Sequence, residues 1–377
     1  MIAKETNFDA RPSVALLVNQ VSPYRVRLFS KLAERFELTI LHGGMESNRP
    51  WKEPVIPGAT SRKVAGWTLT LNRRAAGKAM DQRFLHIEPG YVTELLRLRP
   101  SAIITSEIGL RTLLALSYGA VFRIPVWVWW GGTVHTERHL GLPRRLIRRS
   151  AAKWVRYWIS YGQTSTEYLL SLGVARRCIL QVQNCVDEEV YSRPVAAAMD
   201  LEPKPVLLHA GRLVALKGIA SFLSAAARAQ AQGLEFSILL VGDGPDQRAL
   251  EAMAFELGLR NLRFHPAQPA EAMPAIYRSA DVLVFPTLSD VWGLVANEGV
   301  LSRIRVLCSK YAGCAPELFE SQCIFDPLNE DEFAAALRKA VEGKLPRADP
   351  SRLTPLSDVG EAIADAVLEH LPYRSRS

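Results

Sequence analysis

The sequence is poor in cysteine and contains no long apolar segment. Its five cysteines are an odd number and never form a C-x-x-C pair, which disfavours both a disulfide framework and a zinc site. The longest apolar stretches, such as residues 124–130, are far too short to span a bilayer. The polar, charged start of the chain shows no apolar leader. We therefore expect a cytoplasmic protein.

Repeats and low-complexity tracts are also absent, and 377 residues are enough for two domains, each with its own core. Hydrophobic residues (48%) and charged residues (22%) occur in the proportions of a globular protein. The net charge of +8 favours polyanionic partners such as phosphates, nucleic acid or an anionic membrane, without selecting one of them.

Short β-branched runs alternate with helical stretches, which predicts parallel α/β architecture. The alternation stops at a segment rich in proline and alanine and then restarts. We expect an N-terminal Rossmann-like domain (1–190), a linker (191–204), a second Rossmann-like domain (205–355) and a C-terminal helix (356–377) that crosses back to the first domain. A ligand cleft is expected between the carboxyl ends of the two parallel sheets.

Two strand-to-loop passages of the second half are candidates for binding phosphate. Gly211 and Arg212 follow a predicted strand, and Lys217 precedes a helix, whose free N–H groups and dipole favour an anion. Gly242 and Gly244 follow the next strand. By itself the first passage could be an ordinary surface loop and the second a plain turn. A dinucleotide fingerprint is disfavoured because its third glycine is missing.

A third passage places two carboxylates around the start of a helix. Asp290 and Glu298 are eight residues apart, and Trp292, Gly293 and Leu294 lie between them. A carboxylate that faces a ribose can accept hydrogen bonds from both ribose hydroxyls, and one at the turn can accept from sugar hydroxyls. The structural alternative is a helix cap together with a solvated glutamate.

The segments GRL-x3-KG, LLVGDGP, ADVLVFP and D-x7-E, in this order and spacing, resemble the nucleotide-binding domain of retaining GT-B glycosyltransferases (glycosyltransferase family 4, or glycosyl transferases group 1). Asn184-Cys185-Val186-Asp187 with Tyr191 is similar to the N-G-V-D-x3-F signature of that family. The similarity covers residues 180–320. It implies two Rossmann-like domains whose parallel sheets face each other across a cleft.

The resemblance also implies an activity: retaining, metal-independent transfer of a hexose from a nucleoside diphosphate sugar to a glycan or lipid-linked acceptor in surface polysaccharide or lipopolysaccharide biosynthesis. UDP or GDP is the expected carrier, and no cofactor is expected. Arg212 and Lys217 would neutralise the diphosphate leaving group, where fixed positive charge lowers the barrier most. Asp290 would contact the donor sugar, and Glu298 would hold the ribose. The remaining expected nucleotide-sugar contacts are Gly211, Gly242, Gly244, Trp292, Gly293 and Leu294.

Two features depart from the family pattern. Asp290 stands where glutamate is usual, and Arg303 and Arg305 stand in a stretch that the family fills with small residues. The arginines could be harmless, bind phosphate or mark a disabled donor site. They motivate one alternative, a catalytically weak, nucleotide-sugar-binding accessory subunit. A GT-B sugar-nucleotide epimerase is the other alternative.

Two residues of the first half are candidates for the acceptor side. Arg25, at the start of a predicted helix, could meet a phosphate or carboxylate, or could be structural. His135 follows a strand that ends in two glycines, where many family members place a histidine near the transferred sugar. His139 is the second choice, and a solvated loop histidine is the alternative. Glu107 could face the same cleft or solvent.

Seven Lys or Arg residues and no acidic residue lie between Arg138 and Arg156, interleaved with leucine, isoleucine and tryptophan. A basic helix of this kind is typical of peripheral contact with an anionic membrane. The alternative is a solvated helix whose apolar side packs in the core. No nucleic acid partner is expected, because no binding motif accompanies the positive charge.

Overall fold

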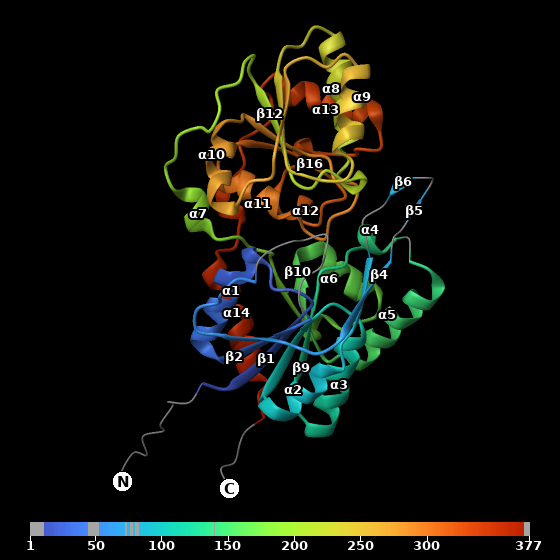
Figure 1. The fold of residues 1–377 in the computed structure, drawn as a ribbon, viewed down its shortest axis with the longest axis vertical. Helices are drawn as coiled ribbons and strands as arrows, with labels where there is room; N and C mark the ends of the chain where they lie inside the picture. Colours follow the sequence, from blue (N-terminus) through green and yellow to red (C-terminus); the bar gives the residue numbers. More distant parts are fainter. Residues whose placement is uncertain are drawn as a thin grey trace.

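The computed structural model describes residues 11–43, 53–71, 74–75, 78–79, 83–138 and 140–372, so His139 lies outside the described residues. Figure 1 shows two α/β bodies stacked along the long axis, the first in blue to green and the second in yellow to orange. Within the described ranges, no helix combines the length and the apolarity that a bilayer crossing requires.

A seven-stranded sheet forms the centre of the first domain, in the order β11-β10-β9-β8-β1-β2-β3, with every neighbouring pair parallel. Its strands are β1 (Ser13–Val18), β2 (Glu37–His42), β3 (Thr60–Lys63), β8 (Ala102–Ser106), β9 (Val126–Trp130), β10 (Tyr157–Tyr161) and β11 (Ile179–Val182). The central strands are apolar on both faces because each face is covered. Leu16 and Leu17, for example, belong to cores on opposite sides.

Helices connect these strands and cover the sheet. They are α1 (Val26–Arg35), α2 (Gly90–Leu98), α3 (Leu110–Phe122), α4 (Val134–Glu137), α5 (Leu142–Trp154) and α6 (Gly162–Ser171). Two small antiparallel pairs join β4 (Trp67–Leu71) with β7 (Arg83–Ile87) and β5 (Arg74–Ala75) with β6 (Lys78–Ala79).

The second domain has a parallel sheet in the order β14-β13-β12-β15-β16-β17. Its strands are β12 (Val206–Ala210), β13 (Ser237–Val241), β14 (Leu262–His265), β15 (Val282–Phe285), β16 (Arg305–Ser309) and β17 (Ile324–Phe325). Its helices are α8 (Ile219–Ala231), α9 (Gln247–Glu256), α10 (Met273–Arg278), α11 (Leu294–Leu301), α12 (Ala315–Leu318) and α13 (Glu330–Val341). The predicted α/β class with two Rossmann-like sheets is confirmed.

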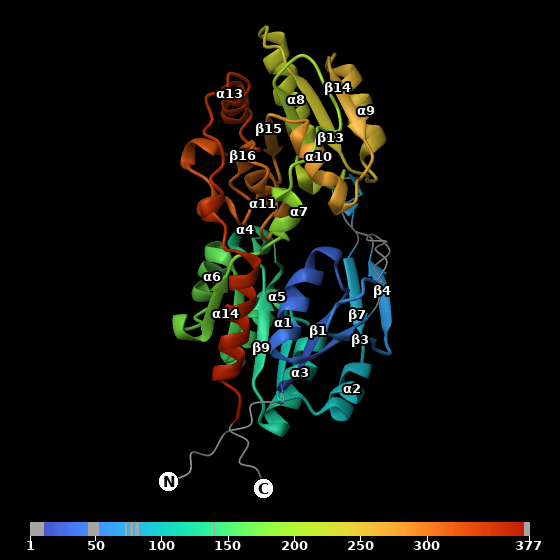
Figure 2. The same cartoon turned by 90° about the vertical axis from the view of Figure 1, so that its left-hand side faces the viewer.

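The chain crosses between the domains twice. The first crossing carries the short helix α7 (Glu188–Ser192), and the second leads into α14 (Leu356–Glu369), the red helix that runs along the first domain in Figure 2. Val359, Ile363 and Val367 of α14 are buried in the core of the first domain. This apolar face ties the end of the second domain to the first, because exposing it would cost about 25 cal/mol for each Å².

Strand order also locates the expected binding edge of each sheet. In the first sheet β2 lies on one side of β1 and β8 on the other. The order of the strands therefore reverses between β1 and β8, which is the topological switch point. In the second sheet the switch point lies between β12 and β15. Open α/β sheets bind ligands at the carboxyl ends of strands beside such a point, because the loops there diverge.

Candidate functional site

The loops that follow β12 and β13 are held together by backbone contacts. The Leu213 N–H donates to the Asp243 carbonyl over 2.9 Å. Gly242 has a φ of +145°, and a Cβ built on it would lie 1.9 Å from the Gly211 carbonyl oxygen. A Cβ on Gly244 would lie 2.2 Å from the Leu213 carbonyl oxygen. These glycines are therefore required for the loops to approach, which explains the G-x-G pattern without a dinucleotide.

Lys217 and Asp290, 73 residues apart in the chain, meet beside the β12–β15 switch point. The Lys217 Nζ lies 2.6 Å from Asp290 Oδ2, and both side chains are largely buried. The other carboxylate oxygen accepts from the Trp292 N–H over 3.3 Å, which orients the pair. A cation that follows the β12 loop therefore sits against an acid that follows β15. A diphosphate binding here would compete with Asp290 for Lys217.

The start of α11 follows directly on this pair. The Trp292 ring is fully buried, and its Nε1 donates to Asn297 Oδ1 over 2.8 Å. The indole is therefore part of the core, and a ligand could reach only the backbone of Trp292. Gly293 has a φ of +101° as the N-cap residue, and Leu294 is the first residue of the helix. Asn297 in turn donates to the Asn184 carbonyl of the first crossing over 2.8 Å.

The Glu298 carboxylate is hydrogen-bonded to two tyrosines. The Tyr277 hydroxyl donates to Glu298 Oε2 over 2.7 Å, and the Tyr191 hydroxyl is a second hydrogen-bond partner. Burial raises the pKa of the Glu298 carboxyl, and the two hydroxyls oppose that shift. The Asn184–Tyr191 segment thus has a physical role, because it clamps the first crossing onto α11 through Asn297 and Glu298.

As the pH rises from 4.5 to 7, the unfolding free energy of Glu298→Gln is expected to increase relative to that of wild type. A carboxyl whose folded pKa is raised contributes most stability below its unfolded pKa and loses it as the pH passes the folded value. Glutamine does not titrate, so the difference in unfolding free energy between variant and wild type should shift toward the variant. Urea unfolding at several pH values measures this difference, with exposed Glu369→Gln as control. A difference that stays constant with pH contradicts the prediction.

His135 reaches the second domain. Its ring makes an edge contact with the Tyr311 ring at a centroid distance of 5.2 Å, and the Asp290 N–H donates to the Tyr311 carbonyl over 3.2 Å. Burial, followed by the charges of Arg138 and Lys310, lowers the pKa of His135. The lowered pKa favours the neutral imidazole, and Tyr311 links His135 to Asp290 by contacting both residues. Sequence reasoning missed Tyr311 as the link.

Arg25 is largely enclosed in the first domain, with only 8% of its surface exposed. Its guanidinium lies 5.1 Å from the ring centroids of both Trp129 and Tyr161 and donates to the Tyr161 hydroxyl. Its Nη1 is buried and has no hydrogen-bond partner among the described residues. The structure therefore packs Arg25 against Tyr161 and leaves one buried guanidinium nitrogen unpartnered among the described residues.

Glu107, which the sequence offered as a residue of the cleft, belongs to a polar group at the first switch point, and its partners Asn19 and Arg111 were not singled out from the sequence. Asn19 follows β1 and Glu107 follows β8, and their side chains approach to 3.5 Å. Glu107 is exposed and has a φ of +64°, which is uncommon outside glycine and asparagine. Arg111 donates to Asn19 and, over 2.9 Å, to Ser106 Oγ. Only the strand order shows that these residues share one loop cluster.

Arg303 and Arg305 lie away from the donor loops. Arg305 begins β16, and its Nε donates to the Leu345 carbonyl over 2.9 Å. Arg303 lies in the turn just before β16, after α11 has ended. Both therefore sit at the amino end of the second sheet, whereas Lys217 and Asp290 lie at its carboxyl end. The arginines therefore do not contact the Lys217–Asp290 pair.

The two domains are in close contact beside the Lys217–Asp290 pair. Thr164 Oγ1 donates to the Gly313 carbonyl over 3.0 Å, and the Gln163 N–H donates to Glu317. A Cβ on Gly162 would lie 2.4 Å from the Trp292 ring. Burial raises the pKa of Glu317, a second acid that was missed from the sequence. This packing brings α6 of the first domain directly onto the loops of the second.

Solved structures share this two-domain fold. HepE of Anabaena, solved with UDP and glucose, superimposes with a TM-score of 0.64 at 16% identity, covering 95% of this chain and 96% of that protein. The lipopolysaccharide outer core galactosyltransferase WaaB, in its apo form, superimposes with a TM-score of 0.69 at 14% identity, covering 95% and 99%. The fold is therefore GT-B.

Sequence comparisons identify the second domain. Residues 198–353 match the model of the glycosyl transferases group 1 family. The putative colanic acid biosynthesis glycosyl transferase WcaI of Escherichia coli is 33% identical over 180 residues, which are 43% of this chain and 42% of WcaI. The 2-deoxystreptamine glucosyltransferase of Streptomyces kanamyceticus is 28% identical over 49% of this chain and 50% of its own length. The chain thus matches about half the length of these relatives or less. Its second domain therefore resembles the glycosyl transferases group 1 family over residues 198–353.

Proposed function

We propose that this protein is a retaining glycosyltransferase that moves a hexose from a nucleoside diphosphate donor to a glycan or lipid-linked acceptor. The observation that carries the proposal is the Lys217–Asp290 pair at the switch point of a group 1 domain. Lys217 ends a 3-10 turn immediately before α8, and Asp290 lies just before α11. A cation and two helix starts at one sheet edge are suited to an anionic leaving group.

Charge placement suggests how the transfer is promoted. Breaking the sugar–phosphate bond leaves negative charge on the diphosphate, and Lys217 and Arg212 would stabilise that charge without a metal ion. When Lys217 turns to the diphosphate, Asp290 is released to accept hydrogen bonds from the donor sugar. The neutral His135 imidazole could share a hydrogen bond with a sugar hydroxyl from the side of the first domain.

The donor and acceptor are proposed from chemistry and from related proteins. HepE was solved with UDP and with UDP-glucose, so we propose a uridine diphosphate sugar as the first donor to test. WaaB and WcaI are named for lipopolysaccharide and colanic acid biosynthesis, so we propose an acceptor from surface polysaccharide assembly. Glu107, Asn19 and the free Nη1 of Arg25 lie on the first domain, where polar acceptor groups would be bound.

A thermal-shift panel tests the donor site. Wild type and Arg212→Ala/Lys217→Ala are compared with UDP, GDP, ADP, CMP and NAD. A ligand at a hundred times its Kd should stabilise by roughly 2.7 kcal/mol. We expect a selective shift with one diphosphate that is lost in the double variant, followed by detection of sugar transfer with the matching donor.

Either of two results would count against the proposal. If no diphosphate shifts the melting temperature, with or without added glycan, the accessory-subunit alternative is favoured. If a diphosphate sugar binds but is isomerised without transfer to any acceptor, the epimerase alternative is favoured.

A further inference from the structure

A hollow of about 530 Å³ lies in the first domain, far from the Lys217–Asp290 pair. It is bounded by the end of α3, the end of α5 and the end of α14, at the amino ends of β9 and β10. The interdomain site lies at the carboxyl ends of the same strands, so the sheet separates the two. The hollow has the volume of a small-molecule site.

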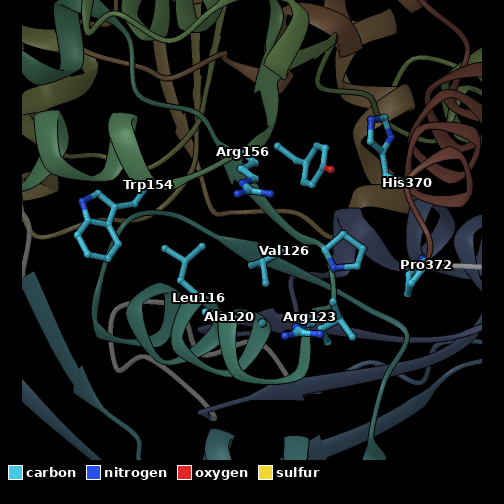
Figure 3. A pocket seen from close by; sticks show the side chains of 12 residues that line it. Leu116, Ala120, Arg123, Val126, Trp154, Arg156, His370 and Pro372 are labelled. Atoms are coloured by element: carbon cyan, nitrogen blue, oxygen red, sulfur yellow. The ribbon is translucent and has the colours of Figure 1, made fainter.

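Two arginines face each other across an apolar floor in this hollow. Figure 3 shows Val126 between Arg123 and Arg156, with Leu116 and Trp154 on one side. Both arginines are exposed. Neither guanidinium makes a hydrogen bond or ion pair with any residue that the structure describes. Two unpaired cations over an apolar surface match a ligand that combines an anionic group with a hydrocarbon part.

The outward face of α5 continues the hollow along the domain. Leu142, Leu146 and Trp154 are four and eight residues apart, so they share one helix face, and 75%, 62% and 79% of their surfaces are exposed. Trp154 also lines the hollow. Apolar side chains exposed in a row on one helix are unusual for a solvated surface, and they mark a contact site.

Cations flank that apolar row. Arg145, Arg149 and Lys153 are exposed and spaced by four residues, so they form a second row beside it. Arg148, in contrast, is used internally, because its Nε lies 2.9 Å from Glu137 Oε2 and its guanidinium lies over the Trp130 ring. Arg148 thus stabilises the first domain, whereas Arg145, Arg149 and Lys153 face solvent. Apolar and basic rows side by side are the arrangement of a helix that lies on an anionic bilayer.

We propose that the hollow binds the headgroup of an anionic phospholipid, with the outward face of α5 lying on the bilayer surface. Arg123 and Arg156 would hold the phosphate, and Leu116, Val126 and Trp154 would contact the glycerol and upper acyl region. Thirteen residues of α5 extend about 20 Å. This helix runs from the hollow to α4, which carries His135 at the domain interface, so the cleft opening would lie close to the membrane. The proposal does not depend on the transfer reaction.

Vesicle co-sedimentation of the full chain tests this site. Vesicles of phosphatidylcholine alone are compared with vesicles that contain phosphatidylglycerol, at constant ionic strength. We expect binding only to the anionic vesicles, reduced about tenfold or more in Arg123→Gln/Arg156→Gln. The matched control is Arg263→Gln/Lys339→Gln, which removes the same charge from exposed positions of the second domain. Brominated acyl chains should quench the tryptophan fluorescence of wild type more strongly than that of the Trp154→Phe variant.

Three results would overturn the proposal. Wild type could fail to bind anionic vesicles. The control pair could lose as much binding as the arginine pair, which would indicate general attraction without a site. The arginine pair could bind as well as wild type, which would exclude the hollow. The UDP-induced thermal shift of each variant shows that its fold is intact, and it separates a failure of this site from a failure of the donor site.

Discussion

Lys217→Met is expected to lower the turnover of sugar transfer by about a hundred- to a thousandfold, the loss seen when one preorganised donor to a developing oxyanion is removed. The reason lies in the geometry, because Lys217 is the cation held directly against Asp290 at the switch point of the second sheet. The measurement is the rate of nucleotide release with the donor identified by the thermal-shift panel, at saturating donor.

Stability must be separated from chemistry in this variant. Removing Lys217 leaves a largely buried Asp290 carboxylate without its cation, which destabilises the fold. The double variant Lys217→Met/Asp290→Asn removes the stranded charge, so it should recover unfolding free energy while turnover stays low. Lys344→Met, which removes an exposed lysine paired with Glu342, is the control and should keep full turnover. Recovery of turnover in the double variant would falsify the leaving-group role of Lys217.

Gly218→Ala is expected to destabilise the protein by about 2–4 kcal/mol and to weaken donor binding. Gly218 has a φ of +67°, and a Cβ there would lie 2.0 Å from the Pro286 carbonyl oxygen. Since that neighbour is backbone, the loop after β15 or the start of α8 must move. Both segments carry the site, so stability and affinity should fall together.

Gly258→Ala is a closely matched control for this substitution. Gly258 has a φ of +64°, nearly the same backbone conformation, but nothing lies within 4 Å of a Cβ built there. It should cost only about 1 kcal/mol, from the left-handed conformation alone. Chemical denaturation measures both variants, and nucleotide titration measures affinity. Equal destabilisation by the two alanines would show that the contact with Pro286 is not the cause.

Local pattern was sufficient for most of the regular structure. The apolar run at 237–241 forms β13, and the segments 110–122 and 294–301 form α3 and α11, in line with the predicted alternation of strands and helices. These segments are rich in apolar residues over a continuous stretch, so neighbouring residues alone define them. Glu330–Val341, which forms α13, was not predicted although Asn329 caps it through the Glu332 N–H. The short strand β17 depends on pairing with β16 and has no local signal.

The candidate site shows the same division. Spacing was enough to recognise Lys217, Asp290 and the glycines of the loops. These residues lie in the loops that follow predicted strands, so their positions can be read from short stretches of sequence. The contact of His135 with Tyr311 and that of Arg25 with Tyr161 were not foreseen. They join segments 176 and 136 residues apart, by subtraction of the residue numbers, and depend on how strands and domains pack.

The sequence by itself determined the α/β class, the two Rossmann-like units and the placing of glycines and charged residues in the loops after β12, β13 and β15. These properties depend on hydrophobic period, turn residues and charge, all of which act over a few residues. Only the tertiary structure decided that Glu298 faces two tyrosines, that Arg303 and Arg305 lie at the opposite sheet edge, and that α5 exposes its apolar row. Those outcomes depend on which surfaces are buried against each other, and burial is a property of the packed molecule as a whole.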